Sequence, residues 1–163
     1  MFRSAVAAIV APILSAAAVA SLVLIISAAG TAAASSSAMS AGGRPTTIKL
    51  GKTSLGMILV NNQGFTLYAF GKDRRNHDSC VSIRNCTGTW PIITTHGRPR
   101  ATGGVNRSML GTIRVKGKTQ VTYGGRPLYG YAGDSSPGQT SYVGVSQFHG
   151  VWRAVKASGK TVG

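Results

Sequence analysis

The sequence predicts an all-β or mostly β fold, in which a duplicated β-hairpin or meander unit forms one small domain. The main observation is a phrase that occurs twice, at 64–73 and 125–134, and that reduces in both places to Gly-x-x-Leu-Tyr-x-(aromatic)-x-x-Asp. Apolar and polar residues alternate over 112–116 and 120–123, as they do in half-buried strands. The chain also contains 22 glycines and shows no helical apolar periodicity after residue 34, so long helices are not expected there.

The first segment, 1–34, predicts an N-terminal hydrophobic helix that serves as a signal peptide or a membrane anchor. Arg3 precedes an apolar run over 5–29, and the small residues Ala32 and Ala34 fit the cleavage rule of secretory signals. The run is longer than a usual signal core and long enough to span a bilayer, so an uncleaved anchor is an open alternative. No cysteine lies near the end of the segment, so lipid attachment through a cysteine is not expected there.

The rest of the chain is predicted to be a flexible Ser-, Ala- and Gly-rich spacer over 35–52 and a two-repeat β-domain over 53–163. Repeat one covers about 53–95 and repeat two about 108–156, each in the order Leu-Gly, strand, turn, Leu-Tyr-x-aromatic, Asp, loop, Trp. Self-similarity of this length implies a supersecondary unit whose two copies pack together. In this alignment Leu55-Gly56 corresponds to Leu110-Gly111, and Trp90 to Trp152.

Turn-forming residues separate the predicted strands. The continuous apolar run 57–60 predicts a strand covered on both faces, unlike the alternating strands of repeat two. Asn and Gly residues then mark the connections. The predicted turns are 61–64, 117–118 and 124–125, and the predicted long loops are 72–89 and 133–150.

Each copy of the repeated phrase predicts a strand that ends shortly before an aspartate. On a strand, Tyr68 and Phe70 share one face and Leu67 takes the other. Asp73 falls beyond the strand end, where it can accept backbone N–H groups in an Asx-type turn, or a tyrosine hydroxyl of the other repeat. We interpret the motif as structural, and its residues are Tyr68, Phe70, Asp73, Trp90, Tyr129, Tyr131, Asp134 and Trp152.

Two functional interpretations of the same residues are open alternatives. Asp73 and Asp134 can converge on a cation or a sugar, although one carboxylate per repeat is few for Ca²⁺, which prefers about six to eight oxygen ligands. The aromatic rings can instead form a platform on which a carbohydrate or a base stacks. Packing in a core is the more common use of such rings.

The chain has two cysteines, Cys80 and Cys86, with five residues between them. In an oxidising compartment such a pair is expected to form a local disulfide, which stabilises the fold by about 2–3 kcal/mol before strain. The alternative is a metal or redox site that combines the cysteines with His77 and His96. The spacing matches no compact metal motif and lacks the Cys-x-x-Cys form that lowers a thiol pKa. No metal site and no cofactor are therefore predicted.

The chain is strongly basic, with 18 Lys and Arg against 3 acidic residues and a net charge of +15. Without Arg3, 17 basic and 3 acidic residues remain, a net charge of +14. Such a charge attracts anionic polymers. The open alternative is that the charge only keeps the protein soluble. The expected partners are an anionic wall polymer, a polysaccharide or lipid head groups, with membrane contact only through 5–29 if that segment is uncleaved. No basic run exceeds Arg74-Arg75, so specific nucleic-acid binding is not expected.

A set of repeated residues also carries a family resemblance. They are Leu55-Gly56, Gly64, Thr66 to Phe70, Asp73, the cysteine pair and Trp90-Pro91 in repeat one, and Thr122-Tyr123, Pro127 to Tyr131, Asp134, Pro137-Gly138 and Trp152 in repeat two. With them the chain resembles secreted bacterial repeat proteins, many of them lipoproteins, named for a Tyr-x4-Asp or Tyr-x-(Phe/Trp/Tyr)-x-x-Asp motif. The resemblance implies export and residence in the cell envelope, and no activity, because the role of that family is not established. The lipid-attachment cysteine of its lipoprotein members is missing here.

The sequence predicts no enzyme. It contains no Gly-x-Ser-x-Gly, no His-Glu-x-x-His and no glutamate, so hydrolysis or two-carboxylate chemistry has no evident residues. We expect an exported cell-envelope protein that binds an anionic surface polymer or serves a structural role. The alternative is a metal- or redox-linked periplasmic accessory protein that uses the cysteines and histidines. The expected location is extracytoplasmic: secreted, periplasmic or anchored to the outer face of the cytoplasmic membrane.

Overall fold

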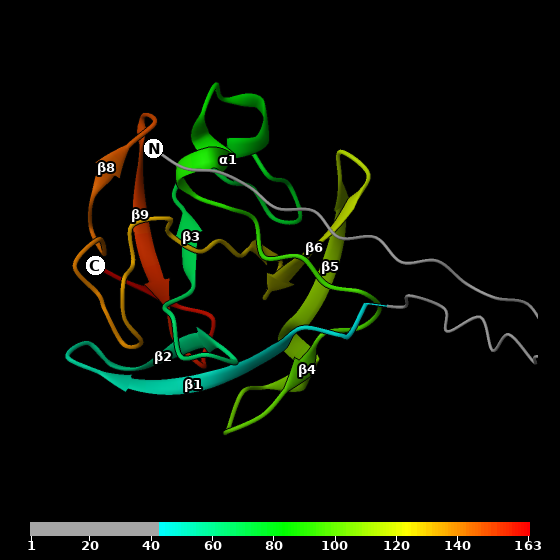
Figure 1. Cartoon of the computed structure of the whole chain (residues 1–163), viewed down its shortest axis with the longest axis vertical. Helices are drawn as coiled ribbons and strands as arrows, with labels where there is room; N and C mark the ends of the chain where they lie inside the picture. Colours follow the sequence, from blue (N-terminus) through cyan, green and yellow to red (C-terminus); the bar gives the residue numbers. More distant parts are fainter. Residues whose placement is uncertain (1–42) are drawn as a thin grey trace, which may run out of the picture. The chain divides into compact units, whose positions relative to one another are not determined.

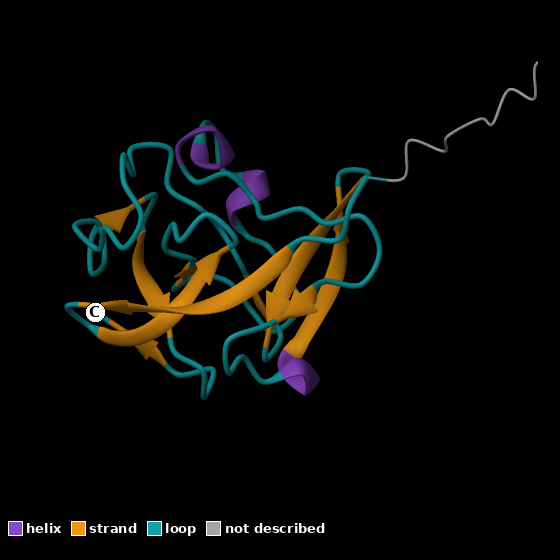
Figure 2. Ribbon diagram, turned by 60° about the horizontal axis from the view of Figure 1, so that its bottom comes forward, coloured by secondary structure: helices purple, strands orange, loops and turns teal. Residues whose placement is uncertain are grey.

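The computed structural model describes residues 43–163, and the predicted signal or anchor at 1–34 lies outside that range. Within the described range strands dominate and helices are short, so the mostly β prediction is confirmed (Figure 2). No helix in this part of the chain is long and apolar enough to cross a membrane.

Repeat one begins with a β-hairpin, which is followed by a short strand and two short helices (Figure 1). Strand β1 (Thr47–Thr53) pairs antiparallel with β2 (Gly56–Asn61), and the hairpin closes where Thr53 lies opposite Gly56. The elements that follow are β3 (Tyr68–Phe70), the 3₁₀ helix η1 (Cys80–Ser82) and α1 (Cys86–Thr89).

Repeat two is built around a second hairpin, made of β5 (Leu110–Val115) and β6 (Lys118–Tyr123). The other elements from residue 100 to the end of the chain, inside and beside repeat two, are β4 (Arg100–Ala101), the 3₁₀ helix η2 (Arg107–Met109), β7 (Arg126–Pro127), β8 (Ser146–Gln147), β9 (Gly150–Val155) and β10 (Thr161–Val162). Their hydrogen bonds give sheets of the orders β2-β1-β4, β5-β6-β7 and β10-β9-β3, and β8 also pairs with β9.

Strand β1 begins at Thr47, inside the range 35–52 that was predicted to be a spacer. It pairs with β2 along its length and with β4 in parallel, and Ile48 is fully buried. The spacer prediction is therefore wrong for 47–52, while 35–42 lie outside the described residues. The physical reason is that two lysines and a glycine interrupt the apolar residues of β1, so its alternation is weak in the sequence.

The two hairpins correspond at an offset of 62 residues, because the first closes at Thr53 and the second at Val115. Strand β1 therefore corresponds to β5, and β2 to β6. The predicted match of Leu55-Gly56 with Leu110-Gly111 is wrong, since the first pair lies at the hairpin turn and the second opens β5. A Leu-Gly pair is too short a signal to fix which strand of a hairpin it belongs to.

Each repeat completes the strand pairing of the other. Strand β3 of repeat one pairs with β9 of repeat two, with Phe70 opposite Trp152. In the reciprocal position, Tyr129 of repeat two forms a bridge with Ile92 of repeat one. The two motif segments meet at Tyr68 and Tyr129, where each backbone N–H donates to the other's carbonyl at 2.9 Å. An approximate two-fold axis at this pair therefore relates the two repeats, and each repeat supplies a backbone pairing partner to the other.

The turns of repeat two have the geometry that two-residue hairpins prefer. Lys116 and Gly117 have φ of 43° and 78°, and Gly124 and Gly125 have φ of 57° and 78°. Positive φ at both central positions is typical of type I′ turns, whose twist matches that of the flanking strands. The second turn lies where the sequence predicts it, and the first begins one residue earlier than predicted.

The side chains of the motif segments divide between two parts of the core. Leu67 and Leu128 join an aliphatic cluster that also contains Ile48. Tyr68 and Tyr129 join an aromatic cluster on the other side. This division is the face assignment that strand geometry predicts, and it places the hydroxyl-bearing rings together.

Strand β2 is covered on both faces over most of its length, as its apolar run predicts. Ile58 and Val60 belong to a cluster on one face, and Leu59 belongs to the aliphatic cluster on the other. Met57 differs, because 48% of its surface is exposed. The two long loops are present, and they contain η1, α1 and β8 as short elements.

Candidate functional site

The aromatic side chains of the two motifs form one stacked column. Trp90 and Trp152 lie face to face, with ring centroids 3.9 Å apart and ring planes within 2°. Phe70 extends the column beyond Trp152 at 4.4 Å, and Tyr131 extends it beyond Trp90 at 4.5 Å. Tyr142, which lies outside the motifs, follows Tyr131 at 3.9 Å. Rings of the two repeats therefore alternate from Phe70 to Tyr131, and the contacts of Tyr131 with Trp90 and Tyr142 are tilted by 44° and 37°.

Two tyrosines pack edge-on against the tryptophans of this column. Tyr68 lies 5.1 Å from Trp90 at 76°, and Tyr129 lies 5.1 Å from Trp152 at 90°. All four rings are fully buried. They present no exposed face to a ligand, so a stacking platform would be left with only the half-buried rings of Tyr131 and Tyr142 at one end of the column.

Each motif aspartate accepts a hydrogen bond from the tyrosine of the other repeat. The Tyr129 hydroxyl donates to Oδ2 of Asp73 at 2.7 Å. The Tyr68 hydroxyl donates to Oδ2 of Asp134 at 3.0 Å. The two carboxylates therefore engage separate tyrosines, and each hydrogen bond links the repeats.

The backbone turns after the aspartates differ from the expected Asx-type turns. Oδ1 of Asp73 accepts the N–H of Ser79 at 2.7 Å, six positions along the chain, and so fixes a wider loop. After Asp134, the N–H of Ser135 donates to Oε1 of Gln139 at 2.9 Å. Both copies thus replace the Asx-type turn. Asp73 accepts a more distant N–H, that of Ser79, and after Asp134 the side chain of Gln139 is the acceptor.

Burial shifts the pKa values of these pairs upward. Burial raises the pKa of Asp73 to about 6, although hydrogen bonds from Ser79 and Tyr129 act to lower it. Burial likewise raises the pKa of Asp134. Burial, together with the facing carboxylate, raises the pKa of Tyr68 and of Tyr129 above the ordinary value. Both hydroxyls therefore stay protonated and act as donors at neutral pH.

Asp78, the third acidic residue of the chain, is also internal. Only 5% of its surface is exposed, and its Oδ1 accepts the N–H of Val81 at 2.8 Å. Its Oδ2 has no hydrogen-bond partner among the described residues. The hydrogen bonds to the three carboxylates thus come from tyrosine hydroxyls and loop N–H groups.

The predicted disulfide between Cys80 and Cys86 is confirmed. Both cysteines are fully buried in the aromatic cluster beside Trp90. His77 and His96 lie on the exposed surface. Within residues 43–163 no group of three or more His, Cys, Asp or Glu side chains is arranged to hold a metal ion. The geometry of the described chain gives no support to the metal alternative.

Gln147 of β8 joins the two tryptophans and was not predicted. The indole N–H of Trp90 donates to its side-chain oxygen at 2.7 Å, and the indole N–H of Trp152 donates to its backbone oxygen at 3.3 Å. A buried indole needs an acceptor, so the sequence implies that one exists. Because one residue serves both repeats, no repeated position identifies it.

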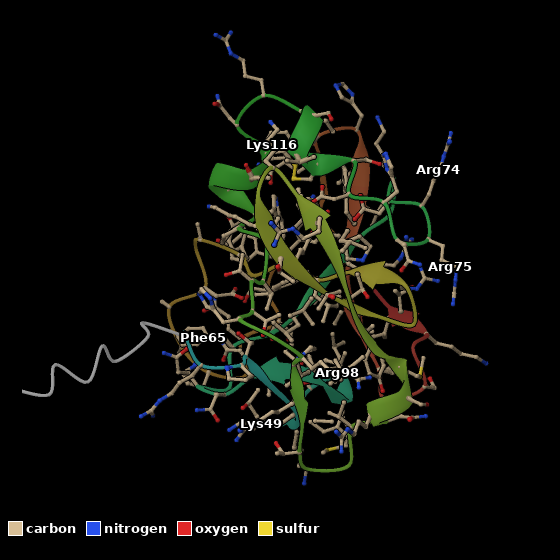
Figure 3. The ribbon with its side chains drawn as sticks, turned by 90° about the vertical axis from the view of Figure 1, so that its right-hand side faces the viewer. Lys49, Phe65, Arg74, Arg75, Arg98 and Lys116 are labelled. Atoms are coloured by element: carbon tan, nitrogen blue, oxygen red, sulfur yellow. A yellow bond between two sulfur atoms is a disulfide. The ribbon has the colours of Figure 1, made fainter. Side chains whose placement is uncertain are left out.

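The basic side chains lie on the outside of the described domain. All Lys and Arg residues in this range are exposed except Lys49 and Arg153, which are partly buried. Figure 3 shows Arg74 and Arg75 projecting from one edge, next to the turn of a neighbouring hairpin. The three carboxylates of the described residues accept hydrogen bonds from tyrosine hydroxyls and loop N–H groups, and of them Asp73 lies closest to these arginines, in the wall of a pocket that they share.

Two hollows in this surface have basic residues in their walls. A broad groove of about 850 Å³ is lined by Arg44 and Arg100 and otherwise mainly by threonine and amide side chains. A smaller pocket of about 210 Å³ is lined by Arg74, Arg75 and Arg126. We call the smaller one the arginine pocket.

The comparison with known families agrees with this architecture. Residues 49–94 and 112–156 each match a family model described as a secreted repeat of unknown function. Each match spans parts of a hairpin, a motif segment and a tryptophan, and the first begins before the predicted start of repeat one. No curated protein and no solved structure matches the chain. The family is described as secreted, which agrees with an extracytoplasmic location. The chain therefore belongs to this family of secreted repeats of unknown function, Lipoprotein_15, and carries two copies of its repeat.

Proposed function

We propose that the protein is a non-enzymatic component of the cell envelope that binds an anionic surface polymer through its basic exterior. The observation that carries the proposal is the separation of charge: the three carboxylates are engaged inside the loops, and the Lys and Arg side chains lie outside. A surface of one sign raises the local concentration of polyanions by Coulomb attraction.

The broad groove supports a polymer as the ligand. Its volume of about 850 Å³ is large for a single sugar, and it is open along the surface. Threonine hydroxyls and the amides of Asn61, Asn62 and Gln63 supply donors and acceptors for sugar hydroxyls. Arg44 and Arg100 supply charge in the same groove. A polar anionic chain matches this combination better than an apolar small molecule does.

The place of action in this proposal is outside the cytoplasm, where the family is described as secreted. If the 1–34 segment stays uncleaved, the domain is held at the outer face of the cytoplasmic membrane. If it is cleaved, the domain is released into the extracytoplasmic space. Both forms meet anionic envelope polymers, so the binding proposal is the same for each.

Titration calorimetry of the purified protein with dextran sulfate tests the proposal, with uncharged dextran as the matched control. We expect binding to dextran sulfate only, with an affinity that falls steeply as salt rises past about 0.1 M, where the Debye length is about 10 Å. Absence of binding at low salt would overturn the proposal and leave a purely structural role. Equal binding to both polymers would show that charge does not drive recognition.

A further inference from the structure

The duplicated fold builds the same corner twice. The N–H of Asn76 donates to the carbonyl of Gly125 at 2.6 Å, and the N–H of Gly138 donates to the carbonyl of Gly64 at 2.9 Å. In each case the loop after one motif meets the hairpin turn before the other motif. Gly64 and Gly125 hold the same position in the repeated phrase. The molecule therefore contains two equivalent corners whose side chains can be compared.

The two corners carry different chemistry. Between the motif aspartate and the donating residue, the first corner has Arg74-Arg75 and the second has Ser135-Ser136-Pro137. After the turn glycine, the first corner has Arg126 and the second has Phe65. The second corner forms without any arginine, so the backbone contact does not require three of them. Three like charges side by side repel one another, so placing them together costs free energy. Their presence therefore indicates a role other than forming the corner.

The first corner, which carries the arginines, surrounds the arginine pocket of about 210 Å³. Arg75 is held in place there, because its Nη1 donates to the carbonyl of Gly124 at 3.0 Å and its side chain packs against Gly125. At the other corner, Pro137 packs directly against Gly64. The Arg75 side chain thus stands where the second corner has an apolar ring.

The other walls of the pocket narrow the choice of ligand. Phe70 and Pro127 contribute apolar surface, and Asp73 contributes a carboxylate. Each oxygen of that carboxylate has one hydrogen-bond partner, Ser79 or Tyr129, so about two of its four lone-pair sites remain for a hydroxyl. A group that presents a phosphate beside hydroxyls satisfies the arginines and the carboxylate together. An anion without a neighbouring hydroxyl satisfies the arginines alone.

We propose that the arginine pocket is a subsite for one phosphodiester of a polyol-phosphate polymer, in which Arg74, Arg75 and Arg126 bind the phosphate and Asp73 accepts a neighbouring hydroxyl. Guanidinium groups suit this role because their planar forks bind phosphate oxygens in pairs. This proposal rests on the proposed function, since it names the polymer and the residues that recognise it.

A matched pair of charge variants tests the subsite. The pocket variant is Arg74→Gln/Arg75→Gln/Arg126→Gln, and the control is Arg84→Gln/Arg98→Gln/Arg107→Gln, which removes the same charge from exposed positions outside the pocket. Calorimetry uses the full protein with poly(glycerol phosphate) and with polygalacturonate. On poly(glycerol phosphate) we expect the pocket variant to lose about 10-fold or more in affinity and the control about 2- to 3-fold. On polygalacturonate we expect the two variants to lose similar amounts.

The outcomes separate the subsite from the general function. Equal losses by both variants on poly(glycerol phosphate) would overturn the subsite and leave polyanion binding intact. Failure of the unaltered protein to bind either polymer would overturn both proposals. A larger loss by the pocket variant on polygalacturonate than on the phosphate polymer would also overturn the subsite as a phosphate site.

A conservative variant keeps the test valid if the glutamine variant does not fold. Arg74→Lys/Arg75→Lys/Arg126→Lys preserves the charge but removes the paired donors of each guanidinium. We expect an unchanged melting temperature, an affinity for polygalacturonate like that of the unaltered protein, and a loss of about 3- to 10-fold on poly(glycerol phosphate). Full affinity of this variant for poly(glycerol phosphate) would overturn bidentate recognition in the pocket.

Discussion

The hydroxyl of Tyr129 and the carboxylate of Asp73 come from different repeats and meet at 2.7 Å beside a fully buried ring. The sequence predicted an aspartate as an acceptor because two of the three acids share one motif position. It could not predict Ser79 or Gln147, since their roles depend on where two long loops fold back. The role of a residue could therefore be predicted where it occupies the same position in both repeats. It could not be predicted for a residue whose contact occurs only once in the molecule.

A double-mutant cycle tests the energy of this hydrogen bond. Asp73→Ala leaves the buried Tyr129 hydroxyl unpaired, so we expect a loss of about 1–3 kcal/mol in the free energy of unfolding. Adding Tyr129→Phe removes the unpaired group, and we expect a coupling of about 1–2 kcal/mol from denaturant unfolding. The Tyr68–Asp134 pair, at 3.0 Å, is the internal comparison and should couple less strongly. Additive losses at the first pair would show that the hydrogen bond does not stabilise the fold.

Asp73 also predicts a pH dependence of stability. Its pKa is about 6 in the folded protein against an ordinary value of 3.8, so the folded state holds the proton more tightly in that interval. Lowering the pH through this window therefore stabilises the folded state, and raising it through about 6 removes that gain. We expect the melting temperature of the protein, relative to that of Asp73→Asn, to rise as the pH falls from 7 toward 4. Parallel profiles of the two proteins would contradict a raised pKa.

At the scale of elements, the central feature is the reciprocal pairing of β3 with β9 and of Tyr129 with Ile92. The sequence predicted strands and turns well where alternation and Gly pairs are strong, as in β5 and β6. It missed the start of β1, whose apolar residues are interrupted by lysines, and it misaligned the Leu-Gly pairs. Strand partners far apart in the chain leave no local signal, so the exchange between repeats could not be predicted.

This exchange predicts that neither half of the domain folds as a monomer. Fragments 43–104 and 105–163 each lack the partner of their motif segment, and each loses half of the tryptophan stack. We expect poor amide dispersion in the NMR spectrum of either fragment alone, and native-like dispersion after the two are mixed. A well-dispersed spectrum from a single monomeric fragment would contradict the reciprocal pairing.

The disulfide gives a second prediction at the element scale. Because it closes a short loop, we expect Cys80→Ser/Cys86→Ser to lower the free energy of unfolding by about 2–3 kcal/mol in denaturant titrations. Both sulfurs are buried beside Trp90, so we also expect the native bond to resist mild reductant until the protein unfolds. The reduced protein provides the control, since its stability should equal that of the variant. Rapid thiol release from the native protein would contradict this burial.

At the scale of the whole molecule, charge dominates. The basic side chains are spread over the outside of the described domain, and they repel one another because they far outnumber the three carboxylates, which accept hydrogen bonds from tyrosine hydroxyls and loop N–H groups. The sequence predicted this charge from composition, and the mostly β class from the repeated phrase, the alternating residues and the many glycines. It could not predict which arginines share a pocket, since Arg74-Arg75 and Arg126 are brought together only by the contact between repeats.

The same repulsion predicts a salt effect on folding that is opposite to the effect on binding. Salt screens the mutual repulsion of exposed cations, so we expect the melting temperature to rise by a few degrees between about 20 mM and about 300 mM NaCl. Affinity for polyanions should fall over the same interval. A melting temperature that falls with salt would indicate that attractive surface charge pairs outweigh the repulsion.

The exchanged strands also constrain how such a chain can have arisen. A chain with one repeat has a motif strand and a tryptophan segment that cannot pair with each other, so it can satisfy both only in a two-fold dimer. In such a homodimer every substitution appears at both corners at once. Joining the two copies in one polypeptide frees the corners to differ, and here one has arginines while the other has serine, proline and phenylalanine. Asymmetry of recognition is thus a property that the fusion itself makes available.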